Sequence, residues 1–140
     1  MKYLLDTCFV SELIRPRQDG GVVRWLRERS ESNLYLSVVT LGELIKGLHK
    51  IRDDDRRRRI QDWLDEELRP RFRDRLLTID SEVAETWGEL CGQAARCGQP
   101  LPVMDAWIAA TAIVHHQVVV TRNVADLERC GAQTFNPWSV

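Results

Sequence analysis

Three acidic residues that are far apart in the sequence, Asp6, Glu43 and Asp105, each stand among apolar residues. A charged oxygen beside a hydrophobic layer is costly unless a cation, a proton or a set of hydrogen bonds compensates it. Carboxylates without Cys or His at metal-ligand spacing are the donors that Mg²⁺ or Mn²⁺ prefers, and these ions also bind phosphate oxygens. The three acids therefore predict a divalent metal site that cleaves phosphodiester bonds with a metal-activated water.

Two further polar residues follow a later apolar run and can support this chemistry. Asn123 can orient a metal-bound water or offer its carbonyl oxygen, and Asp126 adds a negative charge one helical turn later. Taken singly, each candidate also has an ordinary structural interpretation. Asp6 and Asn123 suit helix caps or turns, Asp105 suits the first turn of a helix, and Glu43 suits a surface ion pair. It is the combination that favours a shared site.

Arginines are the candidates for contact with a phosphate backbone. Arg15, Arg17 and Arg122 lie nearest in sequence to the proposed site, and a guanidinium group binds phosphate through paired hydrogen bonds. A denser basic stretch over residues 52–75 is interleaved with acidic residues, so we expect most of its charges to pair on a solvated helix. The formal net charge of −1 says little about partners.

Strands and helices alternate along the chain and must position these residues. Apolar, β-rich runs predict strands at 2–5, 34–37, 76–79, 118–121 and 132–135. Helical spacing predicts helices at 9–15, 22–26, 41–48, 60–68, 83–94, 106–114 and 125–130. Thr40 is expected to cap the third of these helices, and Pro70 to end the fourth. The alternation predicts an α/β fold, a three-layer α/β/α sandwich around a parallel sheet of four to five strands.

Sites in such folds form beyond the carboxyl ends of the strands, where Asp6 and the turn at 121–123 both fall. The 140 residues, 44% of them hydrophobic, predict one domain over 1–140. The first residues are too short an apolar run for a secretory signal or a membrane span, so we expect a cytoplasmic protein without a membrane partner. Four cysteines are expected to be reduced and mostly buried. Trp63 and Trp87 are expected to pack in the core or a dimer contact, because both fall on apolar helical stripes.

The motifs taken together resemble the PIN domain, and within it the VapC and FitB-like toxin ribonucleases. The resemblance spans nearly the whole chain and lies in Asp6-Thr7, Thr40-x-x-Glu43, Asp105-x-x-Ile108-Ala109-Ala110-Thr111-Ala112 and Thr121-Arg122-Asn123. The ending Phe135-Asn136-Pro137-Trp138 is similar to the FitB-like branch. Motifs in this order and at these separations are far more specific than any one of them.

This resemblance implies a PIN-like fold and a Mg²⁺-dependent endoribonuclease, with Mn²⁺ as the alternative ion. It also implies the toxin of a type II toxin–antitoxin pair, acting on RNA, forming a homodimer and assembling with a small DNA-binding antitoxin. Asp6, Glu43 and Asp105 map onto the family's catalytic acidic cluster, in which Asp6 and Asp105 are metal ligands and Glu43 binds directly or through water. Asn123 completes the catalytic group, and the supporting residues are Thr7, Thr121 and Asp126.

Two positions depart from the family pattern. Cys8 stands where many members have Asn or Ser, and Asn123 stands where many have a fourth Asp. Cys8 is expected to weaken a hydrogen bond next to the metal ligands, and Asn123 to lower the affinity for a second metal. These departures support an alternative, a catalytically weak PIN-like module that binds RNA or a protein partner.

Overall fold

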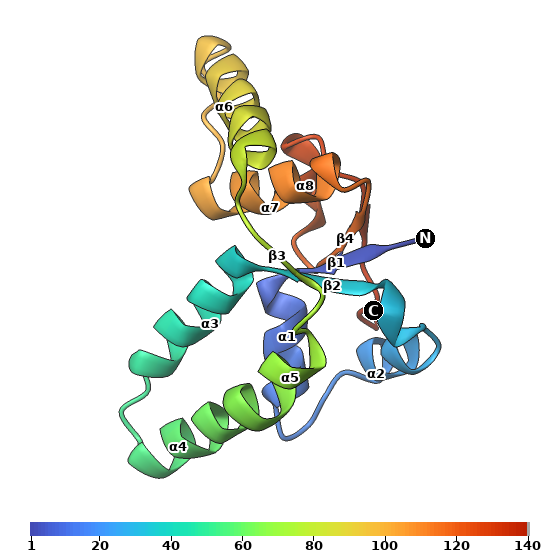
Figure 1. The fold of residues 1–140 in the computed structure, drawn as a ribbon, viewed down its shortest axis with the longest axis vertical. Coiled ribbons are helices and arrows are strands. Elements are labelled where there is room, and N and C mark those ends of the chain that lie inside the picture. The colour runs from blue at the N-terminus through green and yellow to red at the C-terminus, as the bar shows by residue number, and fades with distance from the viewer. Residues whose placement is uncertain (140) are drawn as a thin grey trace.

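A sheet of five short parallel strands forms the centre of the computed structural model, which describes residues 1–139 (Figure 1). The strands are β1 (Tyr3–Leu5), β2 (Leu34–Ser37), β3 (Leu76–Leu77), β4 (Val118–Val120) and β5 (Thr134–Phe135). They pair in the order β3-β2-β1-β4-β5, and every pairing is parallel. The predicted parallel sheet is confirmed at the upper end of its expected strand number.

Helices connect the strands and cover the sheet (Figure 1). The α-helices are α1 (Thr7–Ile14), α2 (Gly20–Arg27), α3 (Val38–His49), α4 (Asp54–Trp63), α5 (Arg69–Arg71), α6 (Ser81–Arg96), α7 (Val103–Val114) and α8 (Val124–Arg129). A 3₁₀ turn, η1 (Glu31–Asn33), precedes β2, and a π-helical turn, η2 (Leu64–Leu68), joins α4 to α5. Helix α6 projects away from the rest of the molecule.

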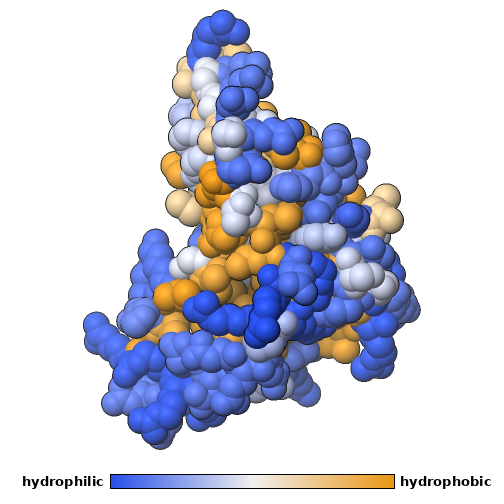
Figure 2. Space-filling view, in the orientation of Figure 1, coloured by the Kyte–Doolittle hydropathy of each residue, from blue (hydrophilic) through white to orange (hydrophobic). Residues whose placement is uncertain are grey.

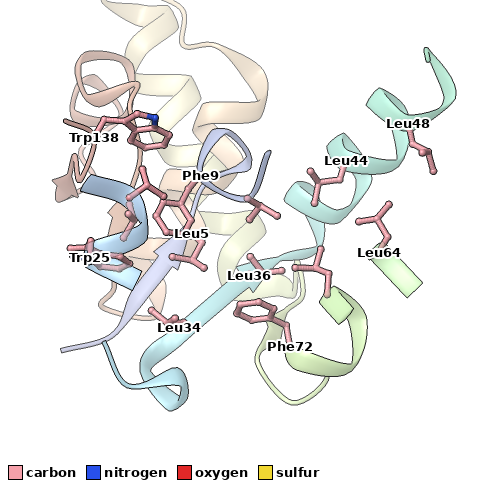
Figure 3. Close-up of a cluster of buried hydrophobic side chains, with 14 residues drawn as sticks. Leu5, Phe9, Trp25, Leu34, Leu36, Leu44, Leu48, Leu64, Phe72 and Trp138 are labelled. Carbon is pink, nitrogen blue, oxygen red and sulfur yellow. The ribbon is translucent and has the colours of Figure 1, made fainter. Parts of the chain in front are cut away.

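Hydrophobic clusters pack on both faces of the sheet because successive strand residues point to opposite sides. Leu5 and Val120 belong to the first cluster, with residues from α1, α2, α3 and η2, and Figure 3 shows this cluster around Phe9. Leu4 and Val119 belong to the second, which packs against α7 and α8. Each fully buried side chain of this size contributes about 1.5–3 kcal/mol. The three-layer α/β/α architecture is thereby confirmed.

Both tryptophans expected to pack against apolar surface do so. Trp87 of α6 stacks on Trp107 of α7 with ring centres 4.2 Å apart and ring planes 2° from parallel. Trp63 packs against the first cluster. Among residues 1–139, no helix is long and apolar enough to cross a membrane.

The charged stretch at 52–75 pairs less than expected, because only four of its arginines form ion pairs among residues 1–139 and two of these pair with Glu31, outside the stretch. Arg57 pairs with Asp54, Arg69 with Asp65, and both Arg71 and Arg75 with Glu31. Figure 2 shows that the surface around α4 is mostly hydrophilic on this face. These pairs are half-exposed or exposed, so each adds little stability.

Three local expectations are wrong. Ser37, not Thr40, caps α3, because its side chain accepts a hydrogen bond from the amide of Val39, and Thr40 is buried inside the helix. Pro70 does not end the fourth helix, since the π-helical turn before it changes the hydrogen-bond pattern and the chain continues to Arg71. Of the four free cysteines, only Cys130 is buried.

Candidate functional site

The site lies where the order of the strands reverses. From β1 the chain leads to β2 and β3 on one side, while β4 and β5 lie on the other. The amide of Asp6 donates to the carbonyl of Val120 at 3.0 Å, so the first residue after β1 is joined to the end of β4. Side chains that follow these two strands therefore meet at the carboxyl edge of the sheet, the usual place for a site in this architecture.

Asp6 is both the cap of α1 and the most enclosed carboxylate of the site. Its Oδ1 accepts a hydrogen bond of 2.8 Å from the amide of Thr7, and its Oδ2 accepts one of 2.8 Å from the buried hydroxyl of Thr121. Only 7% of Asp6 is exposed. Asp6 therefore caps α1 and belongs to the site at the same time, because the capping hydrogen bond to Oδ1 fixes the direction of Oδ2.

Glu43 reaches the same place from α3. The hydroxyl of Thr7 donates to Glu43 Oε1 at 2.6 Å and lies 3.4 Å from the hydroxyl of Thr40. Thr40 and Glu43 are three residues apart on one helix, which puts them on the same face. Thr40 was expected only as a helix cap, although the Thr40-x-x-Glu43 motif already placed it on the same helix face as Glu43.

Asp105 lies in the first turn of α7, the helix that packs in the second hydrophobic cluster. The side-chain amide of Asn123 donates to Asp105 Oδ2 at 3.4 Å, and the backbone amide of Asn123 donates to the Thr121 hydroxyl at 2.9 Å. Asn123 occupies the cap position of α8, but its side chain makes no capping hydrogen bond. The side chain of Asn123 is thus directed to an acid of the site and not to the helix that it precedes.

The carboxylates share one negative field. Burial, followed by the negative charges of Asp6, Asp126 and Glu43 in that order, raises the pKa of Asp105 to about 6. Among residues 1–139, none of these four carboxylates forms a salt bridge with Lys, Arg or His. A cluster of this kind attracts a cation from solution.

The donors fit a hydrated divalent cation. Among residues 1–139, no three His, Cys, Asp or Glu side chains stand close enough to hold a metal ion by themselves. Mg²⁺ keeps several of its waters and binds proteins through one or two carboxylates, so it does not need such a cage. Hard oxygen donors and uncompensated negative charge are what this site offers.

Cys8 lies beside the acids at one of the positions that depart from the family pattern. Its sulfur is 3.6 Å from Asp6 Oδ2 and 3.5 Å from the Thr121 hydroxyl. Burial and the charge of Asp6 raise the pKa of the Cys8 thiol, which keeps it neutral at physiological pH. The thiol therefore serves as a weak hydrogen-bond donor to Asp6.

The three arginines expected to bind substrate have different surroundings. Arg122 follows Thr121 directly and is exposed, Arg15 pairs with Glu12 at 3.3 Å, and Arg17 is exposed after α1. Arg15 also lines a groove of about 540 Å³ that Glu43 borders. The lining residues are Ser11, Leu13, Ile14, Arg15, Pro16, Glu43, Leu44, Gly47, Leu48, Ile51, Arg56, Arg59, Ile60 and Trp63.

Comparison with protein families finds that the PIN domain model matches residues 3–130. A VapC ribonuclease, Y4jK of Sinorhizobium fredii, is 34% identical over 135 residues, which cover 96% of each chain. Toxin FitB of Neisseria gonorrhoeae is 32% identical over 135 residues, covering 96% of this chain and 97% of the relative.

Solved structures show the same similarity. FitAcB from Neisseria gonorrhoeae superposes with a TM-score of 0.91 at 31% identity, covering 99% of both chains. FitAB bound to the IR36 DNA fragment gives a TM-score of 0.90 at 30% identity, covering 99% of this chain and 96% of the other. DNA-bound VapBC from Salmonella typhimurium gives 0.77 at 27% identity, with 97% and 98% covered.

Proposed function

The chain belongs to the PIN-domain family, and on this premise we propose that it is a divalent-metal-dependent endoribonuclease, the toxin of a type II toxin–antitoxin pair. The observation that supports the proposal is that burial and the negative charges of Asp6, Asp126 and Glu43 raise the pKa of Asp105 to about 6, because these acids share one end of the sheet. A cytoplasmic location is part of the proposal.

Asp6 and Asp105 are the proposed ligands of Mg²⁺ or Mn²⁺, and Glu43 binds directly or through water. Such an ion, when bound, lowers the pKa of a coordinated water and offsets negative charge on the scissile phosphate. Thr121 and Thr7 hold the Asp6 and Glu43 carboxylates in place through their hydroxyl groups. Asn123 orients Asp105 through its side-chain amide. The chain needs no nucleophile of its own, because water attacks phosphorus in line and leaves a 5′-phosphate and a 3′-hydroxyl.

Substrate contact is assigned to Arg122, which follows β4, and to Arg15 and Arg17, which follow α1. Arg122 adjoins Thr121, a residue that contacts Asp6, and Arg15 lines the groove bordered by Glu43. Each arginine that neutralises a phosphate makes the affinity for RNA more sensitive to salt. Asp126, one helical turn beyond Asn123, adds to the negative field and supports cation binding.

The groove is the proposed docking surface of a small DNA-binding antitoxin. Its apolar lining from α1, α3 and α4 suits a protein segment, and Arg15, Arg56 and Arg59 favour a segment that also carries acidic residues. The FitAB and VapBC structures that superpose on this chain were solved with DNA. A partner segment in this groove would lie beside Glu43 and obstruct the site.

A homodimer is also proposed, through the start of α7. Val103 and Met104, two apolar side chains directly before Asp105, are 57% and 45% exposed. Apolar surface of this kind is commonly covered by a partner. A second copy packed there would lie close to the acidic cluster.

Cleavage assays test the enzymatic proposal. Purified protein incubated with structured RNAs should cut them in Mg²⁺ or Mn²⁺ and not in EDTA, and Asp6→Asn or Asp105→Asn should abolish cleavage. Asp62→Asn, an exposed acid of α4, is the matched control and should cut like wild type. If chelated samples and both site variants cut as well as wild type, catalysis at this site is wrong.

Growth assays test the toxin role. Expression of the chain alone should arrest growth, and co-expression of the adjacent small open reading frame should restore it. Harmless overexpression of a folded wild-type protein would contradict the toxin role. If RNA binds but is never cut, the module that only binds RNA becomes the better interpretation.

A further inference from the structure

Arg122 is held at the rim of the acidic cluster by the residues on either side of it. Thr121 donates to Asp6, Asn123 donates to Asp105, and the amide of Arg122 itself lies 3.5 Å from the Cys8 sulfur. Among residues 1–139, the Arg122 guanidinium nevertheless forms no salt bridge with these carboxylates. The position of the Arg122 side chain is therefore not set by an ion pair.

The side chain of Arg122 lies over an aromatic ring from the end of the chain. Its guanidinium carbon is 5.5 Å from the centre of the Trp138 ring, within the range of a cation–π interaction. Trp138 is only 8% exposed, and its indole N–H donates to Glu12 Oε1 at 3.3 Å. Its ring also packs edge-on against Phe9 at 6.1 Å, and Figure 3 shows the two side chains together. The indole is therefore a fixed platform set by α1.

The segment that carries Trp138 is itself anchored at the start of α2. The amide of Ser139 donates to Asp19 Oδ1 at 3.0 Å, and the amide of Gly21 donates to the Ser139 hydroxyl at 2.9 Å. A Cβ on Gly21 would lie 2.4 Å from the carbonyl oxygen of Pro137, so the close approach of the two segments requires glycine. These contacts hold the segment at 137–139 against α2 and so help to fix the position of the indole.

We infer that Trp138 is a positioning residue for the nuclease reaction, which holds the Arg122 guanidinium at the rim of the site to bind a phosphate of the RNA. The cation–π contact restricts the rotation of a long side chain, so less conformational entropy is lost when phosphate binds. It also keeps the guanidinium off Asp6 and Asp105, which stay available for a cation. This inference rests on the proposed function, because it assigns a role within that reaction.

Binding of a fluorescein-labelled single-stranded RNA, measured by anisotropy in EDTA over a salt series, tests the inference without cleavage. Arg122→Ala should weaken binding and reduce the salt slope by about 0.7, the contribution of one phosphate contact to a single strand. Trp138→Leu should weaken binding about two- to fivefold, the fold-change of an exposed cation–π contact. The double variant should bind like Arg122→Ala alone, since Trp138 acts only through Arg122.

Conservative variants separate positioning from a general loss of structure. Trp138→Phe keeps an aromatic face and should retain most of the affinity. Trp25→Leu is the matched control, because Trp25 is similarly buried and contacts Tyr3 and Phe9 but not Arg122; it should lower stability without changing RNA affinity. In cleavage assays with Mg²⁺, Trp138→Leu should raise KM and leave kcat unchanged.

The inference is overturned if Trp138→Leu folds and binds RNA like wild type, or if its effect adds fully to that of Arg122→Ala. Should Trp138→Leu fail to fold, Arg122→Lys takes its place, because lysine keeps the charge but loses the planar stacking group. Unchanged RNA affinity of that variant would likewise overturn the inference. Failure of the proposed function looks different, since wild type would then not cleave RNA at all.

Discussion

The hydroxyl of Thr121 donates to Asp6 Oδ2 at 2.8 Å, although 115 residues separate the two in sequence. Thr121 is fully buried, and its oxygen also accepts the amide hydrogen of Asn123. One hydroxyl thus links the end of β1, the end of β4 and the turn that reaches Asp105. The Thr121 hydroxyl is fixed by both hydrogen bonds, the one that it donates to Asp6 and the one that it accepts from Asn123.

Replacing Thr121 by Val should therefore disturb metal binding more than the fold. The loss of a hydrogen bond next to a metal ligand typically costs about 10- to 100-fold in metal affinity or activity, and we expect that range for Thr121→Val. Thr111 is the matched control, because it is equally buried and donates to the carbonyl of Trp107 within α7. Mn²⁺ titration followed by calorimetry should show weaker binding for Thr121→Val and unchanged binding for Thr111→Val; equal Mn²⁺ affinity of Thr121→Val and wild type would contradict the role given to Thr121.

Asp105 should titrate at about pH 6 in the metal-free protein, where an ordinary aspartate titrates near 3.8. Because folding raises this pKa, the folded state favours the protonated form of Asp105. The resulting destabilisation is fully present above pH 6 and is relieved as the pH falls toward 3.8. Carbon-detected NMR of the carboxyl groups measures the titration directly. Chemical denaturation above pH 6 and near pH 3.8 measures the change in the free energy of unfolding.

Removing the charge of Asp6 is the control for that titration. In Asp6→Asn, the pKa of Asp105 should fall because one neighbouring negative charge is gone, while the burial contribution remains. Asp62→Asn, on exposed α4, should leave the pKa of Asp105 unchanged. An Asp105 that titrates near 3.8 in wild type would show that the four carboxylates do not share one field.

The hydroxyl of Thr7 should matter for Glu43 more than its methyl group does. Thr7→Val removes the donor to Glu43 Oε1 and should lower kcat/KM by about tenfold, the lower end of the effect of such a partner. Thr7→Ser keeps the hydroxyl and should retain activity close to wild type. Steady-state RNA cleavage measures both, and similar losses in the two variants would show that the methyl packing, not the hydrogen bond, is what counts.

A charge on the exposed start of α7 should break the proposed homodimer. Met104→Glu places a carboxylate in the apolar surface that Met104 and Val103 form, and burying an unpaired charge is costly. Light scattering after size-exclusion chromatography should show a monomer for Met104→Glu and a dimer for wild type. Met104→Leu keeps the apolar surface and should remain dimeric; a wild-type protein that is monomeric at high concentration would remove the proposal.

The amino-acid sequence by itself determined the local structure and the chemistry on offer. Alternating apolar runs predicted the strands and helices that form the three layers, because periods of two and of about 3.6 residues reflect interactions within a few residues. Residue type identified Asp6, Glu43 and Asp105 as oxygen donors for a divalent cation. Helix boundaries were less well predicted, as Thr40 and Pro70 illustrate, since caps and π-turns depend on small differences in local geometry.

Only the tertiary structure decided which of these residues meet. The order β3-β2-β1-β4-β5 joins the ends of β1 and β4, and no local pattern encodes that order, because it results from packing helices on two faces of one sheet. The cation–π contact of Arg122 with Trp138 and the shared contacts of Thr7, Thr40 and Glu43 likewise depend on distant segments. Burial and neighbouring charges, which exist only in the folded chain, then raise the pKa of Asp105.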